Sequence, residues 1–92
     1  MKIVLRERAA DELDHIHAWI AQDNPRAATE MVARISARIN LLATSGLAYM
    51  GRPGLVPGTR ELVEPPYVIV YEVHEGRDEI VVLAIMHGAQ ER

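Results

Sequence analysis

The last third of the chain holds two segments in which almost every residue is apolar, and they constrain the fold more than any other feature. Residues 67–74 and 79–87 read as two strands, and Glu75-Gly76-Arg77-Asp78 between them is typical of a hairpin turn. In the second strand, alternate positions form two apolar sets: Ile80, Val82, Ala84 and Met86 on one side, and Val81, Leu83 and Ile85 on the other. Antiparallel strands that face water normally carry polar residues on that side. The pair therefore predicts a sheet that needs a cover on both faces.

The first half of the chain predicts a helical hairpin. Apolar residues at positions 9, 13, 16 and 20 recur with helical spacing, and a second such stripe runs from position 28 to 42. Asn24-Pro25 between the stripes is typical of a helix cap followed by the first helical residue, and Gly46 suits the end of a helix. We expect antiparallel helices over about residues 7–22 and 25–44. Trp19, beside the first stripe, is expected in the core or in a groove.

The remaining segments complete an α+β domain spanning residues 1–92. Residues 2–6 and 59–64 are expected strands, and residues 46–58, with four glycines and two prolines, are an expected loop. The predicted order is β-α-α-β-β-β, with the helical hairpin packed on a small, mainly antiparallel sheet. One hairpin covers only one face of such a sheet. The second face is covered either by the long loop or by a partner chain, and a partner chain is the more natural cover.

Composition removes several classes of function. The chain has no cysteine, which excludes a disulfide framework, a thiolate zinc site and a cysteine nucleophile. Neither a signal peptide nor a membrane-spanning segment is evident, so we expect a cytoplasmic protein that does not bind a membrane. His15 and His17 lie near two aspartates, but such neighbours are frequent on amphipathic helices, and no metal site is expected. The glycine-rich loop lacks the Lys-Ser/Thr ending of a phosphate-binding loop, so no cofactor is expected.

The formal net charge of −3 is unevenly distributed. Residues 26–60 carry +4, from five arginines against one glutamate, whereas residues 61–79 carry −5, from six acidic residues against one arginine. Proteins that bind nucleic acids usually show a basic excess, because neutralising phosphates supplies most of the affinity. The overall charge therefore gives no support to a nucleic-acid-binding domain.

The ordered set of motifs resembles the RelE/ParE superfamily of bacterial type II toxins over essentially the whole chain. The resemblance lies in four segments: Ala9-Ala10-Asp11-Glu12-Leu13-Asp14, Gly58-Thr59-Arg60-Glu61-Leu62, Tyr67-Val68-Ile69-Val70-Tyr71, and Ile80-Val81-Val82-Leu83 running into His87-Gly88-Ala89-Gln90. It implies a toxin-antitoxin module of the kind associated with plasmid stabilisation. It also implies a hetero-oligomer with a cognate antitoxin, of ribbon-helix-helix or similar type, whose disordered C-terminal tail wraps the toxin.

Two activities occur in this superfamily. RelE-like members cut mRNA on the ribosome, whereas ParE-like members inhibit DNA gyrase without known catalytic residues. The lysines of the RelE-like basic cluster would fall at Thr59 and Glu61, one arginine at Val68, and a C-terminal arginine near Ala89. This chain has none of these cations, no tyrosine after His87 and no room for a C-terminal helix. It therefore resembles a ParE-like gyrase inhibitor rather than a catalyst.

Two alternatives remain open. The chain could be a ribosome-dependent mRNA endonuclease in which Arg60 contacts phosphate and His87, which titrates near neutral pH, acts as acid or base. The structural interpretation is that His87 ends a strand and bonds to loop backbone, while Arg60 forms an ion pair. The other alternative is an inactive member that still binds its antitoxin.

The antitoxin site is expected to combine cations with uncovered apolar surface. Arginines would meet acidic side chains of the antitoxin, and valines of the sheet would receive its apolar residues. The candidates are Arg34, Arg38, Arg52, Arg60, Val68 and Val70.

Overall fold

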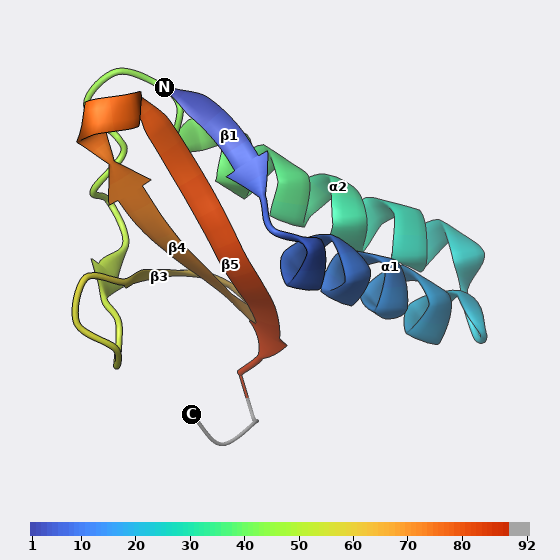
Figure 1. Cartoon of the computed structure of the whole chain (residues 1–92). Helices are drawn as coiled ribbons and strands as arrows, with labels where there is room; N and C mark the ends of the chain where they lie inside the picture. The colour runs from blue at the N-terminus through green and yellow to red at the C-terminus, as the bar shows by residue number, and fades with distance from the viewer. Residues whose placement is uncertain (89–92) are drawn as a thin grey trace.

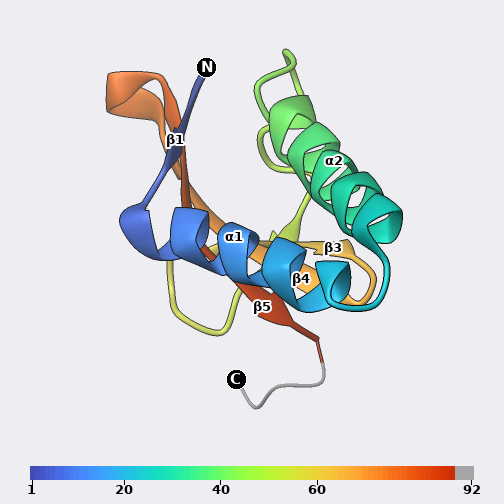
Figure 2. The ribbon, with the colours of Figure 1, turned by 90° about the vertical axis from the view of Figure 1, so that its right-hand side faces the viewer.

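In the computed structural model, which describes residues 1–88, two helices pack on one face of a five-stranded mixed sheet (Figure 1). Figure 2 shows both helices in front of the sheet, on the same side. The elements are β1 (Lys2–Leu5), α1 (Glu7–Ala21), α2 (Pro25–Leu41), β2 (Arg52–Pro53), β3 (Arg60–Glu64), β4 (Tyr67–His74) and β5 (Glu79–His87). The predicted α+β class is confirmed, with β2 as an additional short strand inside the expected loop.

The strand order is β1-β5-β4-β3-β2, in which β1 runs parallel to β5 and every other neighbouring pair is antiparallel. The two central strands, β4 and β5, are those with apolar residues at almost every position. A short 3₁₀ turn, Glu75–Arg77, joins them, and Asp78 closes the turn in the left-handed region with φ of 55°. The N-terminal strand β1 therefore depends on this hairpin for its place in the sheet.

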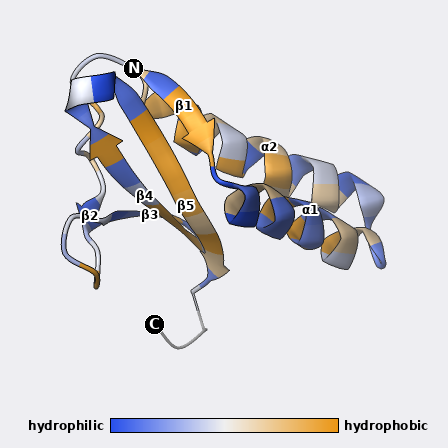
Figure 3. Ribbon diagram, in the orientation of Figure 1, coloured by the Kyte–Doolittle hydropathy of each residue, from blue (hydrophilic) through white to orange (hydrophobic). Residues whose placement is uncertain are grey.

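The core lies between the helical hairpin and the sheet. Buried apolar residues of α1 and α2 pack with buried residues of β3, β4 and β5. Figure 3 shows apolar colouring on both helices and on the long strands of the sheet. The fully buried side chains with the largest volume are Tyr71, Ile35, Leu42, Ile69, Ile80 and Val82. The side chain of Asn24 accepts a hydrogen bond from the amide of Ala27 at 3.0 Å, which confirms the predicted cap of α2.

The predicted alternation of β5 is wrong beyond Val82. Tyr71 pairs with Val82, but the preceding residue of β4, Val70, pairs with Ala84, so Leu83 is an extra residue in β5. Such a β-bulge shifts the side-chain alternation by one position. Ile80, Val82 and Ile85 consequently point into the core. Ala84 lies on the opposite face, although the uninterrupted pattern would have placed it with Val82.

Two further expectations need correction. The helix α2 ends at Leu41 rather than near residue 44, and Gly46, with φ of +83°, lies in the turns that follow the helix. Trp19 is 72% exposed rather than buried, because Ile16 and Ile20 occupy the core side of α1. Among the described residues, no helix is long and apolar enough to span a membrane.

Candidate functional site

The sheet face opposite the helices carries an apolar groove with a volume of about 410 Å³. Residues of β3, β4 and β5 line it, together with the loop between β2 and β3 and one residue of α1. The lining is Arg8, Leu55, Val56, Thr59, Glu61, Val70, Glu72, Leu83, Ala84 and Met86. Val70, a predicted antitoxin contact, is half-buried here, whereas Val68 is only 4% exposed and is not among the lining residues.

The loop beside the groove presents apolar side chains to solvent. Leu55 and Val56 are 66% and 64% exposed. The hydroxyl of Thr59 donates to the carbonyl oxygen of Val56 at 2.6 Å, and the amide of Gly54 donates to the carbonyl oxygen of Thr59 at 2.8 Å. The tip is thus a closed turn held by its own hydrogen bonds. It lines the groove, in which Val70, Leu83 and Met86 are half-buried.

The base of the same loop is fixed to the sheet by the Tyr71 hydroxyl. This buried hydroxyl donates to the carbonyl oxygen of Ala48 at 3.0 Å and accepts from the amide of Gly51 at 3.1 Å. A Cβ on Gly51 would lie 2.6 Å from the carbonyl oxygen of Glu61 and 2.7 Å from the Tyr71 hydroxyl. Only glycine allows this close approach of loop and sheet.

Arg60 belongs to the same anchor. Its guanidinium donates to the carbonyl oxygens of Tyr49, at 3.0 Å, and Gly51, and it lies over the Tyr49 ring with 5.5 Å to the centroid. Loss of hydration raises the pKa of the Tyr49 hydroxyl, its hydrogen bond to the Glu75 carboxylate raises the pKa further, and Arg60 opposes the rise. Arg60 therefore serves loop carbonyls in this structure, rather than the carboxylate that the sequence suggested as its partner.

The other predicted arginines differ in how far they are engaged. Arg52 lies 3.0 Å from Glu61, its cross-strand neighbour, which is only 5% exposed. Arg38 lies 3.5 Å from Glu64 and donates to the carbonyl oxygen of Val63 at 3.3 Å. Arg34 contacts only the sulfur of Met31 at 3.9 Å, and residues 1–88 offer it no carboxylate within 4.0 Å. Of the four arginines, Arg34 is the most available to a partner's carboxylate.

The structure does not bring Arg60 and His87 together. Arg60 pairs with Tyr71 in the sheet, whereas His87 pairs with Tyr67 and meets its ring edge-on at 5.5 Å between centroids. Tyr67 and Tyr71 are four residues apart on β4, which corresponds to about 13 Å along a strand. Thr59 and Glu61, at the positions where the resemblance would place lysines, are both buried, and Ala89 lies outside the described residues.

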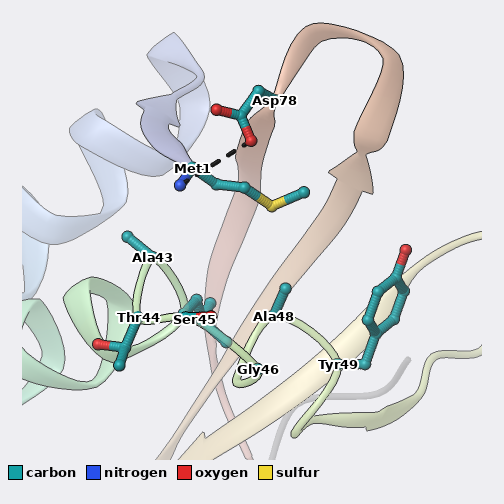
Figure 4. Close-up of a pocket in the computed structure, with 9 residues that line it drawn as sticks. Met1, Ala43, Thr44, Ser45, Gly46, Ala48, Tyr49 and Asp78 are labelled. Atoms are coloured by element: carbon teal, nitrogen blue, oxygen red, sulfur yellow. Dashed lines mark ion pairs between the residues drawn. The ribbon is translucent and has the colours of Figure 1, made fainter.

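A second hollow, of about 380 Å³, lies between the end of α2 and the β4–β5 turn (Figure 4). The terminal amine of Met1 lies 4.0 Å from the Asp78 carboxylate at its rim. Small side chains and the hydroxyls of Thr44 and Ser45 make up much of the remaining lining.

Within residues 1–88, no group of three or more histidine, aspartate or glutamate side chains is placed to hold a metal ion.

Sequence reasoning missed the loop as part of the candidate site. The pair Leu55-Val56 between Gly54 and Pro57 was a usable signal, because two large apolar residues in a glycine- and proline-rich loop have no core of their own. Leu83 and Met86 were recognised as apolar. Their place beside the loop, however, depends on the bulge, which the pattern does not reveal.

Comparisons with known proteins agree with this geometry. Residues 3–92 match the family described as the ParE toxin of the type II toxin-antitoxin system parDE. The chain is 40% identical over 86 residues to "Putative toxin Y4kP" of Sinorhizobium fredii, covering 91% of this chain and 84% of that protein. It is also similar to a chain of the chromosomal ParDE system of P. aeruginosa, with a TM-score of 0.81, 29% identity and 95% of each chain covered.

RelE-type toxins share the fold at lower sequence identity. The match to a chain of the intact E. coli RelBE toxin-antitoxin complex has a TM-score of 0.68 and 14% identity, and covers 99% of this chain and 98% of that one. The isolated E. coli RelE toxin gives a TM-score of 0.69 at 12% identity, with 99% and 87% covered. At these identities the likeness concerns the fold alone.

Proposed function

Because this chain belongs to the ParE toxin family of type II toxin-antitoxin systems, we propose that it inhibits DNA gyrase by binding and not by catalysis. One observation carries the proposal: the residues at the positions that an RNA-cutting relative would use are buried, engaged by other groups or far apart. The positions of the two expected lysines hold buried Thr59 and Glu61, Arg60 is engaged by loop carbonyls, and His87 lies about 13 Å further along the sheet.

Cleavage of RNA without a metal needs a base, an acid and cations gathered around one phosphate. Within residues 1–88, no such group assembles around Arg60, and the position where a relative carries a cation holds Glu61, whose buried carboxylate pairs with Arg52. An inhibitor that acts by binding needs only a complementary surface. This difference supports gyrase over the ribosome as the target. We propose the cytoplasm as the compartment in which the chain acts.

We further propose that the cognate antitoxin occupies the apolar groove on the open sheet face. The groove combines exposed Leu55 and Val56 with half-buried Val70, Leu83 and Met86, so an apolar segment laid there would bury surface that now faces water. Arg34 lies on α2, away from the groove, and is available for an acidic residue of the same antitoxin. Solved relatives that are toxin-antitoxin complexes support a partner of this kind.

The target is tested by two assays on the same purified protein. The wild-type chain is expected to inhibit supercoiling by purified gyrase and to leave translated mRNA intact in primer extension. The variant His87→Ala should inhibit gyrase as well as the wild type does. Codon-spaced mRNA cuts that disappear in His87→Ala, together with unaffected gyrase, would establish the endonuclease alternative instead. Neither effect, with antitoxin binding retained, would identify an inactive member.

A further inference from the structure

Trp19 is the most exposed large apolar side chain of the described residues. It is the only tryptophan in the chain, and 72% of it is exposed on the last turn of α1. No aromatic ring or cation of residues 1–88 contacts its indole. Tryptophan is highly buried on average, and at interfaces it is among the residues that most often carry binding energy. Its exposure therefore points to a contact outside this chain.

Trp19 belongs to a row of exposed residues along α1. Asp11, His15 and Trp19 follow one another at four-residue spacing, and Asp23 continues the spacing in the turn after the helix. Residues four apart are neighbours on a helix surface. We call these four residues the α1 ridge. All four are exposed, so the ridge is a continuous strip of surface.

The carboxylates of the α1 ridge are uncompensated. Neither Asp11 nor Asp23 has an ion pair with any other described residue. The neighbouring Glu12, by contrast, lies 3.4 Å from Arg8 and accepts a hydrogen bond from the amide of Ile85. The ridge thus presents an aromatic face between two free negative charges.

The α1 ridge is distinct from the apolar groove. No member of the ridge lines the groove. The hairpin extends away from the sheet, with the turn between α1 and α2 at its far end (Figure 1), and the molecule is 42 Å long but only 26 and 21 Å across. Trp19 lies near that projecting end, where a large partner can reach it.

We propose that the α1 ridge binds a basic surface of the target enzyme, with an arginine or lysine stacked on the indole of Trp19. An indole face attracts such a cation, and Asp11 and Asp23 supply the complementary charge. An enzyme that handles DNA presents lysine and arginine to the phosphates, so this chemistry matches gyrase. The inference rests on the proposed function and adds to it the surface that makes the contact.

The test compares Trp19→Ala with Trp19→Phe in the gyrase supercoiling assay. Trp19→Ala is expected to raise the concentration for half-inhibition at least tenfold, whereas Trp19→Phe retains a ring and should lose less. Leu41→Ala is the control, because Leu41 is an exposed apolar residue that belongs neither to the α1 ridge nor to the groove. It should leave inhibition unchanged. Because Trp19 is not part of the core, circular dichroism and thermal unfolding of Trp19→Ala should match the wild type.

The charges give an independent variant. Asp11→Asn with Asp23→Asn should weaken inhibition several-fold at low salt and less at high salt, since added salt screens exposed charges. Equal inhibition by the wild type, Trp19→Ala and the double variant would overturn the inference while the proposed function stands. A wild type that leaves gyrase unaffected would overturn the proposed function and this inference with it.

The antitoxin is the competing occupant. We expect Trp19→Ala to bind the cognate antitoxin with unchanged affinity, and Leu55→Ala to bind it more weakly. If Trp19→Ala instead weakened antitoxin binding and left gyrase inhibition intact, the ridge would be part of the antitoxin site and the inference would be wrong.

Discussion

At the scale of single residues, two polar groups join parts of the fold that are distant in sequence. The Tyr71 hydroxyl satisfies one donor and one acceptor of the loop after α2. The Glu12 carboxylate accepts from the amide of Ile85 at 2.9 Å, at the edge of β5 that continues beyond β1. A buried polar group without a hydrogen-bond partner lowers stability. Removing either side chain should therefore lower the free energy of unfolding.

Replacing Tyr71 with phenylalanine should lower the free energy of unfolding by about 1–3 kcal/mol, because the amide of Gly51 and the carbonyl of Ala48 lose their partner. Urea denaturation followed by circular dichroism measures this change. Tyr67→Phe is the matched control, since residues 1–88 show no hydrogen bond to the Tyr67 hydroxyl; it should change stability by less than about 0.5 kcal/mol. Equal effects of the two variants would contradict the anchoring role.

Replacing Glu12 with alanine should lower the free energy of unfolding by about 1–2 kcal/mol and speed hydrogen exchange at the Ile85 amide. Glu12→Gln keeps an acceptor oxygen and should retain most of the protection. Glu7→Ala, an exposed change in the same helix, serves as the control. Unchanged exchange at Ile85 in Glu12→Ala would show that the carboxylate does not protect this amide.

At the scale of elements, the sequence pattern predicted the helices, whose apolar residues recur at regular spacing. It did not predict the register in which the strands pair. The stripes of both helices and the cap at Asn24 were predictable because they are local. The bulge at Leu83 was not predictable. Every residue around it is apolar, so the pattern looks the same whether or not the side-chain alternation shifts by one position. The strand β2 has only two residues, and the loop anchor and the Arg52–Glu61 ion pair hold it beside β3.

The loop anchor makes a prediction for β2. Gly51→Ala would place a Cβ 2.6 Å from the carbonyl oxygen of Glu61, so β2 should move away from β3. We expect a loss of about 1–3 kcal/mol of stability and weaker antitoxin binding, measured by denaturation and calorimetry. Gly76→Ala is the control, because a Cβ added at Gly76 would have nothing within 4 Å of it. A neutral Gly51→Ala would mean that the loop tolerates displacement from the sheet.

At the scale of the whole molecule, the sequence predicted an apolar sheet face as part of the candidate site. It did not predict which residues line the groove or which groups Arg60 contacts. The composition of β4 and β5 predicted a second apolar sheet face that needs a cover, and in the structure this face carries a groove beside which the loop residues Leu55 and Val56 lie. The partners of Arg60 were not predictable, because backbone carbonyls of a loop carry no sequence signal. The exposure of Trp19 was not predictable from its place beside the apolar stripe, because Ile16 and Ile20 take the core side of α1.

The groove predicts how the antitoxin affects global stability. A ligand that binds only the folded state at 100 times its dissociation constant adds about 2.7 kcal/mol to the free energy of unfolding. The antitoxin should therefore raise the melting temperature of the wild type, and the double variant Leu55→Asp with Val56→Asp should lose most of that rise. Leu41→Asp, an exposed leucine at the end of α2 away from the groove, should retain it. An equal rise in both variants would exclude the groove as the antitoxin site.

The attachment of the loop to Tyr71 has a consequence for the timing of inhibition. Because the hydroxyl holds the loop in place without any partner, the toxin carries its binding surface preformed, and the conformational entropy lost on association falls mainly on the antitoxin. When the antitoxin leaves, the anchored loop needs no refolding. Its activity should return as fast as the complex dissociates, with no slower conformational phase after it.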